Sequence, residues 1–266
     1  MVNPFANIAS IILEPDPHLK CESVAQLHDQ FDSLDFNSQS KDIPREIASP
    51  GYPATLQLVA PRELKRRGIQ SQQGRNILMH SIAHIEFNAI NLALDAAYRF
   101  RNQARDYYKD WISIAADEAR HFSMIHDYLK QHDCEYGDYP AHNGLWQMAV
   151  DTQHDIVARM ALVPRVLEAR GLDVTPAIIE KLERVDDHLA VEILKVIYQD
   201  EIGHVEAGSR WFFYQCEQRN LEPRSTFINM VEKYLHGELR GPFNVSARLK
   251  AGFDEFEMAA IDKRYG

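Results

Sequence analysis

The chain is 266 residues long, 45% hydrophobic and 26% charged, with a formal net charge of −10. This length fits one large domain or two small ones, and the hydrophobic share is ample for a packed core. The acidic balance disfavours a nucleic-acid partner, because the phosphate backbone requires cationic contacts. No stretch approaches the ~18 uncharged apolar residues that a membrane-spanning helix needs.

Residues 1–60 are predicted to form an irregular lead, because proline and glycine interrupt them repeatedly, at 16–17, 42–44 and 49–53. The segment MVNPFANIASIILEPDP has no basic region before its short apolar run, so no signal peptide is predicted. A short helix is expected over residues 23–31, with Ser23 as its N-cap. The lead is expected to pack on the rest of the chain, since its large apolar side chains need cover.

Apolar residues at helical spacing then predict four long helices. We expect them at 71 or 74 to 103, 106–132, 145 or 152 to 171, and 187–218. Few residues separate the first two, so they should pack as an antiparallel hairpin. A long crossover marked by glycine and proline follows, and its aromatic residues Tyr136, Tyr139 and Trp146 should pack against the surface.

Gly171 is predicted to stop the third helix in the left-handed conformation, and Thr175-Pro176 to open a short new segment. A tail helix is expected over 225–235, followed by a break at Gly241-Pro242-Phe243-Asn244 and an irregular close. No alternation of apolar residues predicts a strand. The fold class is therefore all-α, with a lead (1–60), a four-helix bundle with one long crossover (61–218) and a tail (219–266).

A repeated acid-histidine motif lies within these helices. Glu118 and His121 are three residues apart, so they share one helix face, which is otherwise apolar. Glu201 and His204 repeat the spacing 83 residues later, again on an apolar face. A carboxylate buried among apolar residues is costly unless it is paired. Two such helices supply half of the ligands of a carboxylate-bridged dinuclear metal site in a four-helix bundle.

One further glutamate on each of two other helices would complete such a site. Glu86 is the charged residue on its helix face and precedes Glu118 by 32 residues. Glu168 precedes Glu201 by 33 residues, which gives two hairpins of nearly equal span. Glu192 falls on the opposite face of the last long helix, and Glu180 falls on the connecting segment, so Glu168 is the preferred candidate.

The repeat of Asp-Glu-x-x-His, as DEARH and DEIGH, resembles the ferritin-like di-iron carboxylate superfamily, which includes oxygen-activating enzymes and, more distantly, MiaE-type tRNA hydroxylases. The runs GRNILMHSIAHIEFNAINLALDAAYRF, DEARHF, VPRVLEARGLDVTP and DEIGHV more closely resemble the uncharacterised DUF455 ferritin-like family, over roughly residues 60–216. The resemblance implies a ferritin-like fold and a set of metal ligands. It implies no reaction, because fold does not determine chemistry.

The ligand set implied is Glu86, Glu118, His121, Glu168, Glu201 and His204. Oxygen-rich sites capped by imidazole suit iron, with manganese as the alternative, better than zinc or copper. In this interpretation Glu118 and Glu201 bridge two ions, the other two glutamates cap one ion each, and each histidine binds one. Four carboxylates balance the charge of two divalent ions and repel one another when the site is empty.

Residues beside the ligands have further predicted roles. In the superfamily, the acids at the positions of Asp117 and Asp200 accept a hydrogen bond from the histidine of the opposite motif, which orients the ring. Arg120 would neutralise one of these acids. His80 and His84 are read as satisfied core histidines rather than ligands. Tyr198 is read as a core tyrosine, with a redox tyrosine as the alternative.

Three functions of different classes remain open at this stage. The first is an O₂-activating oxidoreductase, a hydroxylase or oxidase, with a small-molecule substrate beside Ala89, Ala93 and Ala115 and an external electron donor. The second is a metal-handling or peroxide-reducing protein without an organic substrate. The third is a non-catalytic bundle that binds metal for stability, or a scaffold; a purely structural role would not require six polar core groups, since apolar replacements are commonly more stable. The catalytic residues, the substrate and the oligomeric state are not predicted.

Two further observations limit the partners. Three widely spaced cysteines, Cys21, Cys134 and Cys216, are typical of reduced thiols in a cytoplasmic protein. Because no Cys-x-x-Cys pair is present, a rubredoxin-type iron centre is excluded and electrons must come from another donor. One basic stretch is interpreted as a solvated helix start, with a binding patch as the alternative: Arg62, Lys65, Arg66, Arg67 and Arg75.

Overall fold

The structure, a computed structural model, describes residues 4–36, 43–64, 68–235 and 239–265. These residues are helical without a strand; one isolated bridge joins Leu58 to Ala141. The chain comprises two compact units, residues 1–151 with 185–193 and residues 152–184 with 194–266. The predicted all-α class is confirmed, whereas the division into lead, bundle and tail stays a prediction.

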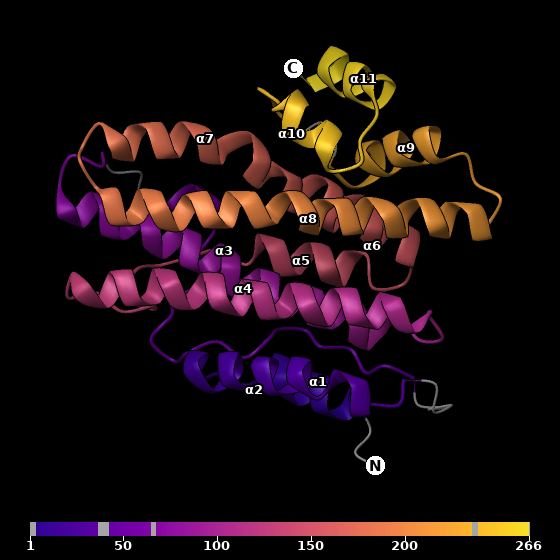
Figure 1. The fold of residues 1–266 in the computed structure, drawn as a ribbon, viewed down its shortest axis with the longest axis horizontal. Coiled ribbons are helices and arrows are strands. Elements are labelled where there is room, and N and C mark those ends of the chain that lie inside the picture. The colour runs from indigo at the N-terminus through magenta and orange to yellow at the C-terminus, as the bar shows by residue number, and fades with distance from the viewer. Residues whose placement is uncertain (1–3, 37–42, 65–67, 236–238, 266) are drawn as a thin grey trace. The chain divides into compact units, whose positions relative to one another are not determined.

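The first unit contains the helices within residues 1–151, the first four of which Figure 1 draws from indigo to magenta, and the start of the long helix that follows residue 187. They are α1 (Pro4–Leu13), α2 (Pro17–Asp29), α3 (Gln72–Arg99), α4 (Arg105–Gln131) and α5 (Gly144–Asp151), with the short turns η1 (Phe31–Ser33) and η2 (Pro61–Glu63) and the first residues of α8 (His188–Gln218). In this unit α3 and α4 form the predicted antiparallel hairpin, α1 packs on α3, and α2 packs on α4.

The long helix α3 begins where the sequence predicts, because the Ser71 hydroxyl accepts a hydrogen bond from the amide of Gly74, at 3.1 Å. The helix is buried on almost every side. One face is apolar around Glu86, and another carries His80, His84, Asn88 and Asn91, all buried. A helix that is buried all round belongs in a core.

The prediction of an irregular lead is wrong for residues 4–29, which form α1 and α2. The Asp16-Pro17 pair starts a helix instead of interrupting the chain. The Asp16 side chain accepts from the amides of His18 and Leu19, and Pro17 occupies the first helical position, where its missing N–H costs nothing. The predicted helix over 23–31 falls largely within α2.

The second unit contains α6 (Ile156–Leu162), η3 (Val163–Glu168), α7 (Ala169–Glu183), most of α8, α9 (Pro223–Leu235), α10 (Val245–Lys250) and α11 (Glu255–Tyr265). The segment η3 is a π-helix that carries Pro164. Gly208 of α8 lies directly against it, and a Cβ added to Gly208 would lie 2.2 Å from the Cβ of Pro164. The proline ring and the glycine therefore allow a close approach within this unit.

The predicted third helix differs from the observed one at both ends. It is interrupted at residues 152–155 and then continues through Gly171 as far as Glu183. Pro176 lies inside α7 and cannot bond the carbonyl of Leu172, four residues earlier. The side chain of Asn244 donates to that carbonyl instead, at 3.2 Å. The predicted stop at Gly171 and new start at Thr175 were therefore wrong.

The last predicted helices are largely confirmed, since α8 and α9 begin and end within two residues of the predicted bounds. The predicted irregular close is wrong, because α10 and α11 follow the break at residues 241–244. Asn244 caps α10 by accepting from the amide of Ala247, at 3.2 Å. The cap explains why a helix restarts directly after the break.

Candidate metal centre

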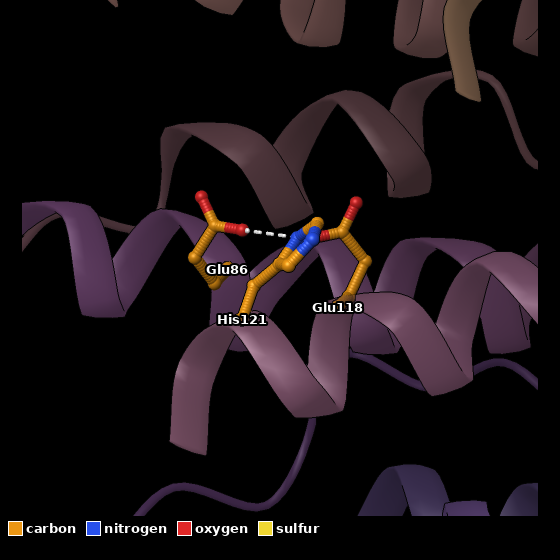
Figure 2. A group of neighbouring side chains, drawn as sticks. All are labelled: Glu86, Glu118 and His121. Atoms are coloured by element: carbon orange, nitrogen blue, oxygen red, sulfur yellow. Dashed lines mark ion pairs between the residues drawn. The ribbon is translucent and has the colours of Figure 1, made fainter. Parts of the chain in front are cut away.

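In the first unit, α3 and α4 bring two acids and an imidazole together in the core (Figure 2). Glu118 and His121 are fully buried on α4, and Glu86 on α3 is 3% exposed. The Nδ1 atom of His121 lies 3.2 Å from Oε2 of Glu86 and 3.4 Å from Oε2 of Glu118. The geometry of this unit thus brings Glu86 and the first motif into one buried group that could hold a metal ion, and their role as ligands stays a prediction.

Burial and the interactions among these side chains shift the pKa values of Glu86 and of the imidazole in this group. Burial, reinforced by the charge of Glu118, raises the pKa of Glu86 to about 8. Burial alone would lower the pKa of His121, but hydrogen bonds to Glu118 and Glu86 outweigh it and raise that pKa to about 10. The imidazole therefore holds a proton between the two acids. A divalent ion would replace that proton, because metal ligation requires the neutral ring.

The surroundings of the group are apolar. Ala83, Ile90, Ala115 and Phe122 lie on the two facing helices and are buried. The small residues expected beside a substrate, Ala89, Ala93 and Ala115, are likewise no more than 5% exposed. Such an environment excludes water and strengthens charge interactions. The substrate pocket itself stays a prediction.

In the second unit, α8 carries the other motif. Glu201 is 8% exposed and His204 is 4% exposed, and Nδ1 of His204 lies 4.0 Å from Oε2 of Glu201. Both histidines thus present the same ring nitrogen to the acid of their own motif. This shared geometry follows from the common three-residue spacing on a helix.

Glu168 is half-buried at the end of η3. Among the described residues, it belongs to no group of three acids and imidazoles whose ligand atoms all lie within 4.8 Å of one another. The two alternatives, Glu180 and Glu192, are exposed to solvent. Burial therefore favours Glu168 over both, and its role as a ligand stays a prediction.

The residues beside the first motif make one of the predicted contacts. Arg120 forms an ion pair with Asp117 at 3.3 Å, and the same guanidinium nitrogen lies 3.4 Å from Nε2 of His121. Asp117 and Asp200 are half-buried. The predicted hydrogen bonds from each acid to the histidine of the opposite motif remain predictions.

His80 and His84 are engaged in hydrogen bonds away from the acid cluster. His80 Nε2 accepts from the amide of Gly137 at 2.9 Å. His84 lies 2.8 Å from the Tyr136 hydroxyl through Nδ1 and 3.0 Å from the His142 carbonyl through Nε2. Burial lowers the pKa of both histidines to about 4, so they are neutral core residues. The contacts of His84 fit the prediction of a satisfied core histidine, whereas the buried Nδ1 of His80 has no hydrogen-bond partner among the described residues.

Tyr198 is half-buried, and its hydroxyl accepts a hydrogen bond from the Asn244 side chain, at 3.0 Å. This contact engages the tyrosine with the tail of its own unit and fits the reading as a structural residue. The aromatic residues of the crossover also behave as predicted. Tyr136 and Trp146 are at most 4% exposed, and Tyr139 is half-buried.

The sequence reasoning missed the π-helix and the role of Arg165 inside it. Arg165 is fully buried, pairs with Glu257 and lies between aromatic rings. A proline in the middle of an otherwise helical run, as in VPRVLE, was the available signal. Single π-helical turns within longer helices are frequent at functional sites.

The three cysteines are free thiols, as expected from their spacing. Burial raises the pKa of each of them to about 11, so none is a reactive thiolate near neutral pH. Three of the residues in the basic stretch, Lys65, Arg66 and Arg67, lie outside the described residues. The neighbouring Arg75 pairs with Asp187 at 2.9 Å.

Comparison with known families decides the classification. The model of the family described as "Protein of unknown function (DUF455)" matches residues 13–259. The chain belongs to the DUF455 family. The match extends beyond the stretch 60–216 that carried the sequence resemblance and includes most of the lead and the tail.

One similar protein is an "Uncharacterized protein" of Haemophilus influenzae (strain Rd). It is 41% identical over 254 residues, which cover 91% of this chain and 88% of the relative. No solved structure matches. One helix of this DUF455 chain, α3, is long and apolar enough to cross a membrane, but 72% of its apolar window is buried inside the structure. A buried core helix passes the same test of length and composition, and the cytoplasmic location stays a prediction.

Proposed function

We propose that this protein holds a dinuclear metal centre in a ferritin-like bundle and is an O₂-activating oxidoreductase. The observation that carries the proposal is the buried group of Glu86, Glu118 and His121, in which both acids lie within 3.4 Å of one imidazole nitrogen. Ligand atoms that share an ion at about 2.0–2.2 Å lie about 3 Å apart. The acid and imidazole atoms are therefore spaced as a metal ion requires.

The second half of the proposal rests on the repeated motif in the sequence. Glu201 and His204 reproduce the spacing and burial of the first motif, and Glu168 has nearly the same separation from Glu201 as Glu86 has from Glu118. The donor set of acids and imidazoles supports iron, with manganese as the alternative. When bound, such ions supply the redox capacity to activate O₂ for a small organic substrate, with electrons from an external donor.

The chain's own residues would prepare this chemistry. His121 would present Nδ1 to the metal after losing its proton, while Arg120 remains beside the other ring nitrogen. The buried alanine and isoleucine side chains around the acids would exclude bulk water, which protects a reactive site from side reactions. A purely structural role explains the acids less well, because a buried polar triad is commonly less stable than an apolar replacement.

The first test is elemental analysis of protein produced with iron or manganese available. We expect about two ions per chain, because four acids balance two divalent ions. Glu192→Ala serves as the control, since Glu192 is an exposed acid on α8, nine residues before Glu201. Protein that carries no metal and takes up none on reconstitution would contradict the proposal.

The second test separates an oxidoreductase from a metal-binding bundle. Iron-loaded protein supplied with a reductant should consume O₂, and Glu118→Ala should lose this consumption because one buried acid is removed from the group. Consumption is measured with an oxygen electrode against the same concentration of free iron. Equal rates for both proteins and free iron would leave metal binding without oxygen chemistry.

A further inference from the structure

The C-terminal segment of the second unit contacts the chain on both sides of Glu168. Before Glu168, the fully buried Arg165 of η3 places Nη2 at 2.9 Å from both carboxylate oxygens of Glu257 on α11. One guanidinium nitrogen is thus shared between both oxygens, and a charge-assisted hydrogen bond of this kind is stronger than one between neutral groups. The helix that carries Glu257 thereby fixes the residue that lies three positions before the candidate ligand.

Arg165 has a second anchor to the same segment. Its Nε donates to the Ser209 hydroxyl at 3.2 Å, and that hydroxyl donates to the carbonyl of Ala251 at 2.8 Å. The guanidinium carbon also lies 4.4 Å from the ring centres of Phe227 and Phe253. Charged and aromatic contacts from α9 to α11 therefore surround the side chain at the centre of the π-helix.

After Glu168, the first turns of α7 are held by two more tail residues. Arg248 donates to both carboxylate oxygens of Asp173, at 2.9 and 2.7 Å, and both side chains are at most 1% exposed. Arg248 also reaches the carbonyl of Ala169 at 3.4 Å. The backbone amide of Asn244 donates to Asp173, and its side chain donates to the carbonyl of Leu172 that Pro176 leaves free.

Burying the charged groups of these contacts costs free energy through the loss of their hydration. Two buried arginine-carboxylate pairs, Arg165–Glu257 and Arg248–Asp173, lie on either side of a single glutamate. Buried ion pairs contribute little net stability, but they fix geometry. A π-helix departs from the ordinary helical hydrogen-bond pattern and needs surrounding structure to maintain it. The tail supplies that structure at η3.

We propose that the tail, residues 241–265, positions Glu168 as a metal ligand by holding η3 and the start of α7 in register. The inference rests on the proposed metal centre. Glu257 is its principal positioning residue and acts through Arg165. Outer residues that orient ligands commonly change metal affinity by about 10- to 100-fold when they are substituted.

The test compares Glu257→Gln with Glu232→Gln in the full-length protein. Glu232 of α9 is exposed and pairs with Arg264 of α11 at the surface. The control variant therefore removes the same charge and an ion pair that also holds α11, but at the surface. Manganese binding is measured by titration, and electron paramagnetic resonance distinguishes a coupled pair of ions from isolated ones. We expect Glu257→Gln to bind one of the two ions about 10-fold or more weakly and to lose the coupled signal. Glu232→Gln should retain both.

Hydrogen-deuterium exchange of the metal-free proteins gives a readout that does not depend on metal. In Glu257→Gln, amides of residues 163–173 should exchange faster than in the wild type, and in Glu232→Gln they should not. Asp173→Asn, which removes the partner of Arg248 at the other side of Glu168, should reproduce both effects even if Glu257→Gln does not fold.

The outcomes separate the two proposals. A wild type that binds two ions, with Glu257→Gln and Asp173→Asn binding both equally well, overturns the positioning role alone. A wild type that binds no manganese or iron overturns the metal centre and this inference with it. Loss of one ion in Glu232→Gln as well would show a general loss of stability and would also overturn the specific role of Glu257.

Discussion

Lys20 shows how a single buried amine ties the lead to the core of the first unit. It lies on α2 without exposed surface, and its Nζ atom lies 2.6 Å from Oδ1 of Asn91 and 2.9 Å from the carbonyl of Ile12. The carbonyl of Gly51 is 3.2 Å from this nitrogen, and the centre of the Phe87 ring is 4.6 Å from it. One side chain thus joins the end of α1, a loop and α3.

We predict that Lys20→Met destabilises the protein by about 1–3 kcal/mol, because buried oxygen acceptors lose their donor. The loss should grow with pH. Burial lowers the pKa of Lys20 to about 7, with Cys21 and Glu14 opposing the shift, while the unfolded value is 10.5. Between these values the unfolded chain binds more protons than the folded chain, so wild-type stability rises with pH and the variant lacks that gain.

Urea unfolding of both proteins at several pH values from 7 to 10 measures the effect. Lys20→Arg is a useful comparison, because it retains a positive charge that does not titrate in this range. A difference between wild type and Lys20→Met that stays constant or shrinks with pH would contradict the prediction.

At the scale of elements, the sequence predicted the helices that are determined by residues within or next to the helix itself. The bounds of α3, α4, α8 and α9 follow from apolar periodicity and from caps such as Ser71, all within a few residues. The continuation of the helix from α6 through α7 depends on contacts with residues that are distant in sequence. Pro176 is tolerated inside α7 because Asn244, far along the chain, satisfies the freed carbonyl of Leu172. Gly171 was predicted to stop the helix because glycine commonly ends helices in the left-handed conformation, and the local sequence does not show that this helix continues.

Glycine substitutions test this course of the chain. Gly171 lies inside α7, and a Cβ added there would meet nothing within 4 Å. We predict that Gly171→Ala stabilises the protein by up to about 1 kcal/mol, since alanine is the better helix former. Had Gly171 adopted the left-handed conformation of a helix stop, alanine would destabilise instead. Urea unfolding at constant pH gives the sign.

Gly208→Ala is the matched counterpart on α8. The new Cβ would lie 2.2 Å from the Cβ of Pro164, so α8 or η3 must shift, and such overpacking costs about 1–3 kcal/mol. The same helix preference would otherwise favour alanine at both positions. Stabilisation by Gly208→Ala would therefore show that η3 does not pack closely against this glycine.

At the scale of the whole molecule, the candidate site was predictable as far as helix faces determine it. Glu86, Glu118 and His121 were expected together because each is a polar residue on an apolar helix face, and the first unit brings them together. Periodicity could not reveal that η3 is a π-helix or that Arg165 is buried within it, because both depend on α11 and on aromatic residues distant in sequence. Sequence span selected Glu168, and its burial relative to Glu180 and Glu192 agrees with that choice.

The last prediction asks whether the two motifs serve one shared centre or two separate ions. If Glu118 and Glu201 bridge the ions, removal of either acid should weaken both, because each ion loses a ligand. Removal of His121 or His204 should weaken only one, because each histidine binds a single ion. We therefore expect Glu118→Ala and Glu201→Ala to retain close to no metal, and His121→Ala and His204→Ala to retain about one ion per chain, relative to two in the wild type. Metal content after reconstitution and desalting, with circular dichroism to confirm folding, measures these values.

Glu118→Ala that retains one tightly bound ion, in the same amount as His121→Ala, would instead indicate two mononuclear sites. The balance of four acids against two divalent ions would then not explain the ligand set. The proposal of O₂ activation by a coupled pair of ions would lose its basis.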